Sequence, residues 1–238
     1  MMSQHLCDIN CDLGEGMGND TELMGFIDSC NIACGGHFGT LKTVQETIKL
    51  AQKHRVKIGA HPSYPDPENF GRCLMPMRDE ELQHTLIEQL QLFKQACSLQ
   101  ASTAHHVKLH GALYNAAAKD LSIAKVVLSA ISSVFKDVII YAPYDSVLAQ
   151  LAQQQFVVKH EAFIDRRYLN DLSLVPRHHP QAVIDNPQQA WQQLSLLIEQ
   201  GKVITLEGEV KTLKAETFCL HGDATNALSI IEYIRKCL

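Results

Sequence analysis

The sequence contains 238 residues, of which 46% are hydrophobic and 20% are charged, a composition typical of a folded globular protein. This length matches one α/β barrel or one doubly wound unit, so a single domain spanning residues 1–238 is expected. The formal net charge is −5, and the lysines and arginines are scattered along the chain. These features argue against a nucleic-acid partner, which needs a concentrated basic surface.

The chain shows no targeting or membrane signal. Its first 13 residues, MMSQHLCDINCDL, have neither the basic nor the apolar region of an export signal, and no apolar run approaches the roughly 18 residues of a membrane span. The eight cysteines are therefore expected to be free thiols, most of them buried. The sequence predicts a cytoplasmic protein that does not enter a membrane.

Short apolar runs alternate with amphipathic segments along the chain, the pattern of repeated βα units around a parallel sheet. Strands are expected at residues 6–10, 30–34, 56–60, 105–109, 138–142, 156–163 and 217–221. Helices are expected at residues 22–27, 40–54, 82–97, 123–135, 145–154, 190–200 and 227–238, with a hairpin at 203–213. Seven strands alternating with helices predict a closed (β/α) barrel, with its chemistry at the carboxyl ends of the strands.

The first expected strand runs into an acidic, glycine-rich stretch, DINCDLGEGMGND. It contains four acids and three glycines: Asp8, Asp12, Glu15, Asp20, Gly14, Gly16 and Gly18. Crowded carboxylates raise one another's pKa, which makes the stretch a candidate floor of an active site. The glycine spacing does not match a dinucleotide-binding loop, and the chain has no P-loop motif. Asp8 and Asp12 are expected to face the barrel mouth.

Four histidines, His37, His61, His110 and His221, follow the ends of four expected strands. In a barrel such positions converge on one mouth, which packing alone explains poorly. With Asp8 and Asp12 they could form a metal site of the Asp/His/His type or a metal-free acid–base cluster. The sequence leaves both interpretations open.

Basic side chains add anion-binding capacity to the same mouth. Lys108 lies two residues before His110, so both should point into the barrel, where Lys108 either holds an anion or pairs with Asp8 or Asp12. The guanidinium groups of Arg166, Arg167 and Arg177 suit carboxylate or phosphate, and surface salt bridges are the alternative, more so for Arg167 than for Arg166. The adjacent pairs His105–His106 and His178–His179 are not assigned to the site, because neighbours on a strand point to opposite faces.

Several blocks together resemble the LamB/YcsF family of lactam utilisation proteins. They are DINCDLGEG, NIACGGH, IGAHPSYPD with NFGR, VKLHGALYN, EAFIDRRY with LVPR, and CLHGD, in order from residue 8 to residue 223. The resemblance implies a distorted seven-stranded (β/α) barrel of the glycoside hydrolase/deacetylase type. It also implies opening of the lactam ring of 5-oxoproline to L-glutamate, coupled to ATP hydrolysis, in a 5-oxoprolinase complex with two partners, subunits B and C.

The resemblance also implies site residues. The implied catalytic set is Asp8, Asp12, Glu15, His37, His61, Lys108 and His110. The implied substrate- or phosphate-binding set is Gly14, Gly16, Asn31, Tyr114, Asn115, Asp165, Arg166, Arg177, His221 and Asp223. A divalent metal, if used, would be held among Asp12, His37, His61 and His110, and ATP would be a co-substrate.

The chain departs from the family pattern at Cys11, Gly36, Thr40 and Leu109. Thr40 replaces an acidic residue, so substrate or metal affinity could differ if that acid is used. Two other functions remain open: a metal-dependent amidase or polysaccharide-deacetylase-like hydrolase, and a non-catalytic barrel that binds a small ligand. The sequence also leaves open whether the chain forms a homo-oligomer.

Overall fold

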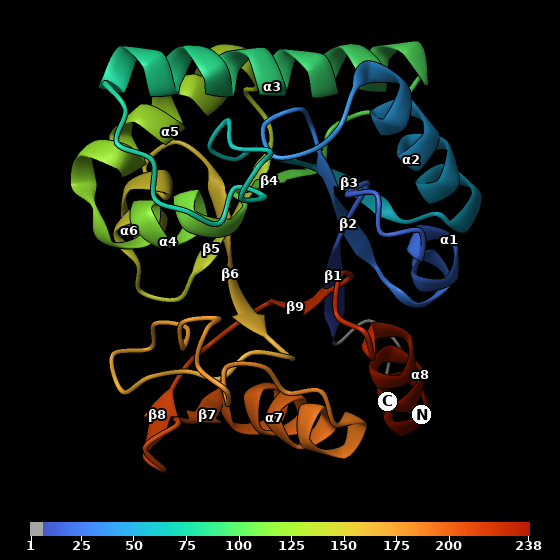
Figure 1. Cartoon of the computed structure of the whole chain (residues 1–238), viewed down its shortest axis with the longest axis vertical. Coiled ribbons are helices and arrows are strands. Elements are labelled where there is room, and N and C mark those ends of the chain that lie inside the picture. The colour runs from blue at the N-terminus through green and yellow to red at the C-terminus, as the bar shows by residue number, and fades with distance from the viewer. Residues whose placement is uncertain (1–6) are drawn as a thin grey trace.

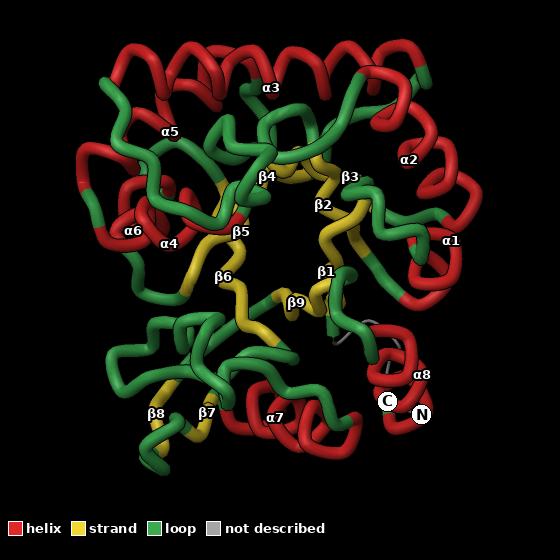
Figure 2. Tube along the Cα trace, in the orientation of Figure 1, coloured by secondary structure: helices red, strands yellow, loops and turns green. Residues whose placement is uncertain are grey.

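Seven parallel strands close into a barrel in the computed structural model, which describes residues 7–238 (Figures 1 and 2). The strands are β1 (Asp8–Leu13), β2 (Ser29–Ala33), β3 (Lys57–His61), β4 (His106–Lys108), β5 (Ile139–Pro143), β6 (Val157–Phe163) and β9 (Thr217–His221). Each strand pairs with the next in this order, and β9 also pairs with β1. The predicted closed α/β barrel of seven strands is therefore confirmed.

Helices surround the ring of strands, as the trace in Figure 2 shows. They are α1 (Asp20–Leu23), the short 3-10 helix η1 (Met24–Phe26), α2 (Leu41–His54), α3 (Asp79–Leu99), α4 (Gly111–Lys119), α5 (Leu121–Val134), α6 (Val147–Ala152), α7 (Pro187–Gln200) and α8 (Ala227–Cys237). The antiparallel hairpin β7 (Lys202–Ile204) and β8 (Val210–Thr212) lies outside the barrel beside α7. Within residues 7–238, no helix is both long and apolar enough to cross a membrane.

The first strand is longer than predicted. It runs to Leu13 instead of ending at Asn10, and Leu6 lies outside the described residues. The prediction ended the strand where polar residues begin, but Asn10 and Asp12 are buried on the inner face of the barrel. Their neighbours Ile9 and Cys11 belong to the hydrophobic core, so β1 alternates between a polar lumen and an apolar outer face.

Helix α4 was not predicted. It begins directly after His110 and buries Leu113, Tyr114 and Ala117. The helix is only nine residues long, and its first residues belong to the block VKLHGALYN. So short a stretch shows too few apolar residues at helical spacing to predict a helix. It carries Tyr114 and Asn115 to the carboxyl ends of the strands.

Helix α2 accounts for one departure from the family pattern. Thr40 is its exposed N-cap, where the hydroxyl accepts from the Thr43 backbone N–H and the Thr43 side chain caps the Thr40 N–H in return. The helix then buries Val44, Ile48 and Ala51 against the core. Thr40 therefore has a structural role and does not enter the barrel mouth.

The cysteines are free, as expected. Six of the eight are buried, and only Cys73 and Cys237 are exposed. Burial raises the pKa of the Cys7 and Cys34 thiols to about 12, so these side chains behave as small apolar residues.

Candidate active site

The lumen of the barrel holds a continuous set of hydrogen bonds. Asn31 Nδ2 donates to Asn10 Oδ1 and to Asp12 Oδ1, both at 2.8 Å. His106 Nε2 lies 2.7 Å from Asn31 Oδ1, and because that oxygen only accepts, this imidazole nitrogen carries the hydrogen. Asn10 Nδ2 in turn donates to Glu161 Oε1 at 2.9 Å. These contacts hold the Asn31 amide, and through it the Asp12 carboxylate, in one orientation.

Lys108 places an ammonium group among these carboxylates. Its Nζ lies 2.9 Å from Asp12 Oδ1, 3.1 Å from Glu161 Oε1 and 2.9 Å from Cys219 Sγ. Burial lowers the pKa of Lys108, but the Asp12 charge and its neighbours outweigh it and hold that pKa well above its ordinary value. Burial likewise opposes ionisation of Asp12, yet His61 and Lys108 hold the pKa of this carboxyl well below its usual range. Lys108 and Asp12 are thus a buried ion pair.

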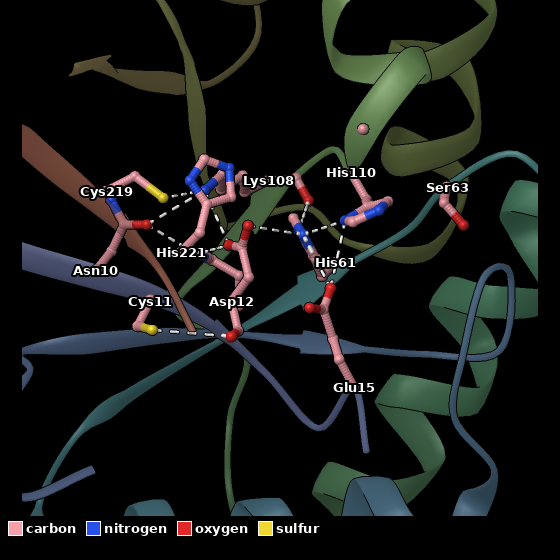
Figure 3. Close-up of polar contacts among 12 residues, drawn as sticks. Asn10, Cys11, Asp12, Glu15, His61, Ser63, Lys108, His110, Cys219 and His221 are labelled. Atoms are coloured by element: carbon pink, nitrogen blue, oxygen red, sulfur yellow. Dashed lines mark hydrogen bonds and ion pairs between the residues drawn. The ribbon is translucent and has the colours of Figure 1, made fainter. Parts of the chain in front are cut away.

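Three histidines and Glu15 form a second cluster beside Asp12; Figure 3 shows Glu15, His61 and His110 pointing toward one another. His37 Nε2 lies 2.9 Å and His110 Nδ1 lies 3.4 Å from Glu15 Oε1. His61 Nε2 lies 3.3 Å from Asp12 Oδ2 and 2.9 Å from His110 Nδ1. The rings of His37 and His110 stack, with centroids 3.7 Å apart. The cluster joins residues from β1, from β3 and from segments that follow β1, β2 and β4.

The cluster contains a carboxyl group suited to proton transfer. Burial, followed by the charge of Asp12, raises the pKa of Glu15 to about 7. Burial lowers the pKa of His37 to about 4, so its imidazole is neutral at physiological pH. An acid that titrates near neutrality beside the neutral His37 imidazole can both accept and return a proton.

A pocket of about 40 Å³ opens above Asp12 at the carboxyl ends of the strands. Its lining residues are Asp12, Lys108, Leu109, His110, Gly111, Tyr114, Asn115, Phe163, Arg166, Leu174, Arg177 and His221. A neighbouring pocket of about 140 Å³ shares Tyr114, Asn115, Phe163 and Leu174 with it. The two pockets therefore adjoin along α4.

The rim of the pocket has an excess of positive charge. Arg166 is buried, and its guanidinium donates to the Val175 carbonyl at 2.7 Å and to the Ala182 carbonyl at 3.3 Å. Burial and the charge of Arg177 lower the pKa of Arg166 to about 10, which still leaves it charged at neutral pH. Arg177 Nη1 lies 3.6 Å from Asp223 Oδ2, which also accepts from Arg72. Asp223 offsets part of the charge of Arg72 and Arg177, while Arg166 has only carbonyl oxygens as partners, so the rim keeps a positive charge that favours an anionic ligand.

His221 borders the pocket and is fixed by Asp165. Its backbone N–H donates to Asp165 Oδ2 at 3.0 Å, and its Nδ1 lies 3.0 Å from each oxygen of that carboxylate. Because carboxylate oxygens accept, Nδ1 carries a hydrogen, and Nε2 is the ring nitrogen that Asp165 leaves free. Asp165 thus orients His221 without itself lining the pocket.

The structure brings most of the sequence-predicted residues together. The cluster beside Asp12 contains Glu15, His37, His61, Lys108 and His110. Around it lie the pocket residues Tyr114, Asn115, Arg166, Arg177 and His221, together with the supporting residues Asn31, Asp165 and Asp223.

Three predicted residues lie elsewhere. Asp8 is at the amino-terminal end of β1, four residues before Asp12, where it lies 3.5 Å from Lys57 Nζ and 3.6 Å from Lys159 Nζ. The expectation that Asp8 faces the mouth is therefore wrong, because parallel strands carry their first residues to the opposite end of the barrel. Gly14 and Gly16 have positive φ in the loop after β1 but do not line the pocket.

Sequence reasoning missed four residues that support the site: Asn10, Ser63, His106 and Glu161. A signal existed for two of them, because Asn10 precedes Asp12 by two residues and His106 precedes Lys108 by two. On a strand this spacing places both members of each pair on the same face. The adjacency of His105 and His106 excludes only one of them from the site, because one member of such a pair faces outward and the other, His106, faces inward.

Donor atoms for a metal ion also converge here. The described residues contain three sets whose donor atoms lie within 4.8 Å of one another: Asp12–His61–His110, Glu15–His37–His110 and Asp12–Cys219–His221. All three sets lie at the same mouth, and the first two mix imidazole nitrogens with carboxylate oxygens.

The fold and site define a seven-stranded (β/α) barrel with a buried carboxylate–histidine cluster beneath a cationic rim. The chain belongs to the LamB/YcsF family, whose sequence profile matches residues 7–238. It is 39% identical over 230 residues to a protein from Histophilus somni named as the A subunit of 5-oxoprolinase, covering 96% of this chain and 93% of that protein.

Two further relatives extend the comparison. A protein of the same name from Pyrococcus horikoshii is 38% identical over 237 residues, covering 97% of this chain and 93% of that protein. The crystal structure of a lactam utilization protein from Thermus thermophilus superposes with a TM-score of 0.88 at 31% identity, covering 97% of this chain and 96% of that one. Similarity therefore extends over nearly the whole chain.

Proposed function

We propose that this chain is the A subunit of an ATP-dependent 5-oxoprolinase, which opens the lactam ring of 5-oxoproline to give L-glutamate, ADP and phosphate. The observation that carries the proposal is the carboxylate–histidine cluster under a cationic rim, in a chain that shares 38–39% of its residues with proteins named for this activity. Subunits B and C would be its partners, and the eight free cysteines fit a reducing cytoplasm.

The rim fits the charged end of the substrate. 5-Oxoproline carries one carboxylate, and Arg166 and Arg177 line the pocket with guanidinium groups. Bidentate binding of a carboxylate by arginine fixes orientation as well as affinity. With the carboxylate held at the rim, the lactam ring would reach down toward His110 and Asp12.

Residues beside the pocket supply the proton transfers. Glu15 would take a proton from the attacking water and return one to the departing ring nitrogen, because its raised pKa of about 7 suits both steps. His110, which lines the pocket, would donate to the ring amide the proton that its Nδ1 shares with His61 Nε2, 2.9 Å away. Asp12, ionised and paired with Lys108, would hold this arrangement and not act as the base.

ATP supplies the driving force. A five-membered lactam is stabilised by resonance, and phosphorylation of its carbonyl oxygen makes the ring carbon electrophilic. Water would then add to that carbon and the C–N bond would break, which leaves the γ-acyl phosphate of glutamate; a second water would hydrolyse this acyl phosphate to L-glutamate and inorganic phosphate. The chain has no P-loop, so we propose that the partner subunits share in nucleotide binding.

The test is reconstitution of the complex. The purified chain, combined with subunits B and C from the same organism, is supplied with 5-oxoproline and MgATP, and glutamate and ADP are measured. The proposal expects one glutamate per ADP, and none when ATP or any one of the three proteins is omitted. Folded complex without turnover would contradict it. Glutamate formed without ATP would favour the amidase alternative instead.

A further inference from the structure

The larger of the two pockets, about 140 Å³ in volume, is lined by two buried polar side chains, Glu161 and Tyr114. They are only 2% and 4% exposed. Glu161 Oε1 is bound by Lys108 Nζ at 3.1 Å and by Asn10 Nδ2 at 2.9 Å, but Glu161 Oε2 forms no hydrogen bond within residues 7–238. The Tyr114 hydroxyl likewise forms none in the part of the chain that the structure describes. Buried polar atoms are normally paired, so an occupant of the pocket is expected to complete both.

Both atoms favour an occupant that donates hydrogen bonds. A carboxylate oxygen only accepts, and the phenol oxygen has lone pairs that accept as well. Burial, followed by the charge of Glu161, holds the pKa of Tyr114 well above its ordinary value, so the phenol is neutral and the negative charge belongs to Glu161. A positively charged N–H donor fits this pair better than a neutral donor, because a charge-assisted hydrogen bond is about twice as strong.

The charge of the larger pocket is negative. Its charged lining residues are three carboxylates and one ammonium, namely Asp145, Glu161, Asp171 and Lys119. The ammonium of Lys119 lies 3.4 Å from Asp171 at the exposed surface, so it does not reach the buried carboxylate. Lys108 is shared between Glu161 and Asp12, and one ammonium does not neutralise two carboxylates. A cation beside Glu161 Oε2 would therefore be stabilised.

The two adjoining pockets have opposite charges. Arg166 and Arg177 line the smaller pocket, where the substrate carboxylate is expected to bind, and Glu161 lines only the larger one. A ligand that spans both pockets would therefore carry a carboxylate and an ammonium group. These are the charges of an α-amino acid, whereas the lactam 5-oxoproline has the carboxylate alone.

Opening of the lactam creates this ammonium group and also a hazard. Cleavage of the C–N bond leaves the γ-acyl phosphate of glutamate with an α-amine on the same chain. If the amine attacks the acyl carbon, the C–N bond forms again, the amine loses a proton, and the C–O bond to phosphate breaks. The products are 5-oxoproline and phosphate, so one ATP is hydrolysed without release of glutamate. Closure of a five-membered ring is intramolecular and therefore fast.

We propose, on the basis of the function proposed above, that the larger pocket binds the α-ammonium group of the opened chain and prevents this closure, with Glu161 Oε2 and Tyr114 Oη as its acceptors. The released amine takes a proton from solvent, and the protonated amine has no lone pair with which to attack. An ion pair with Glu161 favours the protonated form. The α-carboxylate stays at the rim while the second water hydrolyses the acyl phosphate.

Binding to the isolated chain tests the ammonium subsite apart from the reaction. Calorimetric titration compares L-glutamate with glutarate, which has the same two carboxylates but no ammonium group. The wild-type chain is expected to bind L-glutamate at least about tenfold more tightly, since charged hydrogen bonds are worth this much or more. Equal affinity for the two ligands, or binding of neither, would overturn the proposal and leave water as the occupant of the pocket.

Two variants locate the subsite. Tyr114→Phe removes only the hydroxyl, and Glu161→Gln removes the charge at nearly constant volume; each is expected to reduce the preference for L-glutamate to about twofold or less. Tyr233→Phe is the matched control, because Tyr233 lies on α8 and lines neither pocket. Circular dichroism shows which variants are folded. Because Glu161 also pairs with Lys108, Tyr114→Phe alone decides the outcome if Glu161→Gln does not fold.

The reconstituted complex tests the protective role. In water labelled with ¹⁸O, ring closure from the acyl phosphate places the label in the carbonyl group of recovered 5-oxoproline. Wild type and Tyr233→Phe are expected to form about one ADP per glutamate and unlabelled 5-oxoproline. Tyr114→Phe is expected to form two or more ADP per glutamate, with labelled 5-oxoproline, a change in ratio that a merely slower enzyme would not show.

The outcomes separate this proposal from the proposed function. A folded Tyr114→Phe complex that forms one ADP per glutamate and unlabelled 5-oxoproline would overturn the protective role, while wild-type turnover still supports the 5-oxoprolinase. A wild-type complex without turnover would contradict the 5-oxoprolinase, and the preference of the isolated chain for L-glutamate over glutarate would then decide whether the ammonium subsite exists.

Discussion

The ammonium of Lys108 lies 2.9 Å from Asp12 Oδ1, in the lumen of the barrel where both side chains are shielded from water. A buried pair of this kind contributes little net stability, but loss of one partner leaves an uncompensated charge. Lys108 also neutralises Glu161, so its removal would expose two carboxylates to each other. The pair is therefore a condition for the Asp12 carboxylate to stay ionised.

Lys108→Met is expected to destabilise the protein by roughly 3–5 kcal/mol, the range found when one partner of a buried ion pair is removed. Lys119→Met is the matched control, because the pair of Lys119 with Asp171 is largely exposed and such pairs are worth about 1 kcal/mol or less. Urea unfolding at pH 7 measures both. Equal, small losses in the free energy of unfolding for the two variants would show that the charged groups in the lumen are not shielded from water.

Gly59→Ala tests the packing that orients His106. A Cβ at Gly59 would overlap His106 Cδ2 and Nε2, so the imidazole would have to leave Asn31. A loss of about 1–3 kcal/mol in the free energy of unfolding is expected, as for other overpacked interiors. Gly25→Ala is the control, since its new Cβ would have no neighbour closer than 3.8 Å.

The Gly59→Ala variant is also expected to change the kinetics of the reconstituted complex. Displacing His106 frees the Asn31 amide that binds Asp12, so Gly59→Ala should lower kcat more than it raises KM for 5-oxoproline. A stable Gly59→Ala variant with normal kcat would show that His106 does not position the site.

Arg177→Gln tests the rim as the carboxylate anchor. Removing one guanidinium from the pocket should raise KM for 5-oxoproline by roughly tenfold, the equivalent of one charge-assisted hydrogen bond, with a smaller effect on kcat. Arg55→Gln, on the exposed end of α2, should leave both constants unchanged. An unchanged KM in Arg177→Gln would place the substrate carboxylate elsewhere.

Asp165 should make stability depend on pH. Burial opposes its ionisation, but the charge and hydrogen bonds of His221 outweigh burial and lower the pKa of Asp165 below its ordinary 3.8. As pH falls through this range the unfolded chain takes up the proton first, so this carboxylate stabilises the fold above pH 3.8 and loses that effect at lower pH.

Asp165→Asn should therefore cost about 1–3 kcal/mol at pH 6, the value of a buried hydrogen-bonded group. The difference from the wild type should shrink between pH 4 and pH 3. Asp137→Asn, at an exposed position, should show no such difference at either pH. A pH-independent cost for Asp165→Asn would mean that packing, not charge, gives Asp165 its role.

The strands and the histidines at their ends could be predicted because all strands of a parallel barrel run in the same direction. Each strand ends at the same mouth, so His61 and His110 could be placed together from their positions after apolar runs. The same rule, applied to strand starts, explains the error at Asp8. Asp8 is the first residue of β1. The apolar pattern did not show where this strand begins, because polar residues that face the lumen alternate with the apolar ones.

The lumen and the tautomers could not be predicted. His106 enters the lumen from β4, a strand of only three residues, and the alternation of so short a run does not separate it from His105. The direction of each imidazole depends on backbone carbonyls such as that of Phe70, which lies in a loop with positive φ at that residue. Such contacts follow from tertiary structure and leave no local pattern.

The most direct test of the account is the rate of the reconstituted complex with Glu15→Gln. Glutamine keeps the size of the side chain and can still hydrogen-bond His37, so assembly and melting temperature should match the wild type. Glutamate release is expected to fall by about 100-fold or more, because a general acid–base group contributes roughly that much. A folded, assembled Glu15→Gln complex that releases glutamate at the wild-type rate would contradict this role and show that Glu15 is not the general acid–base group.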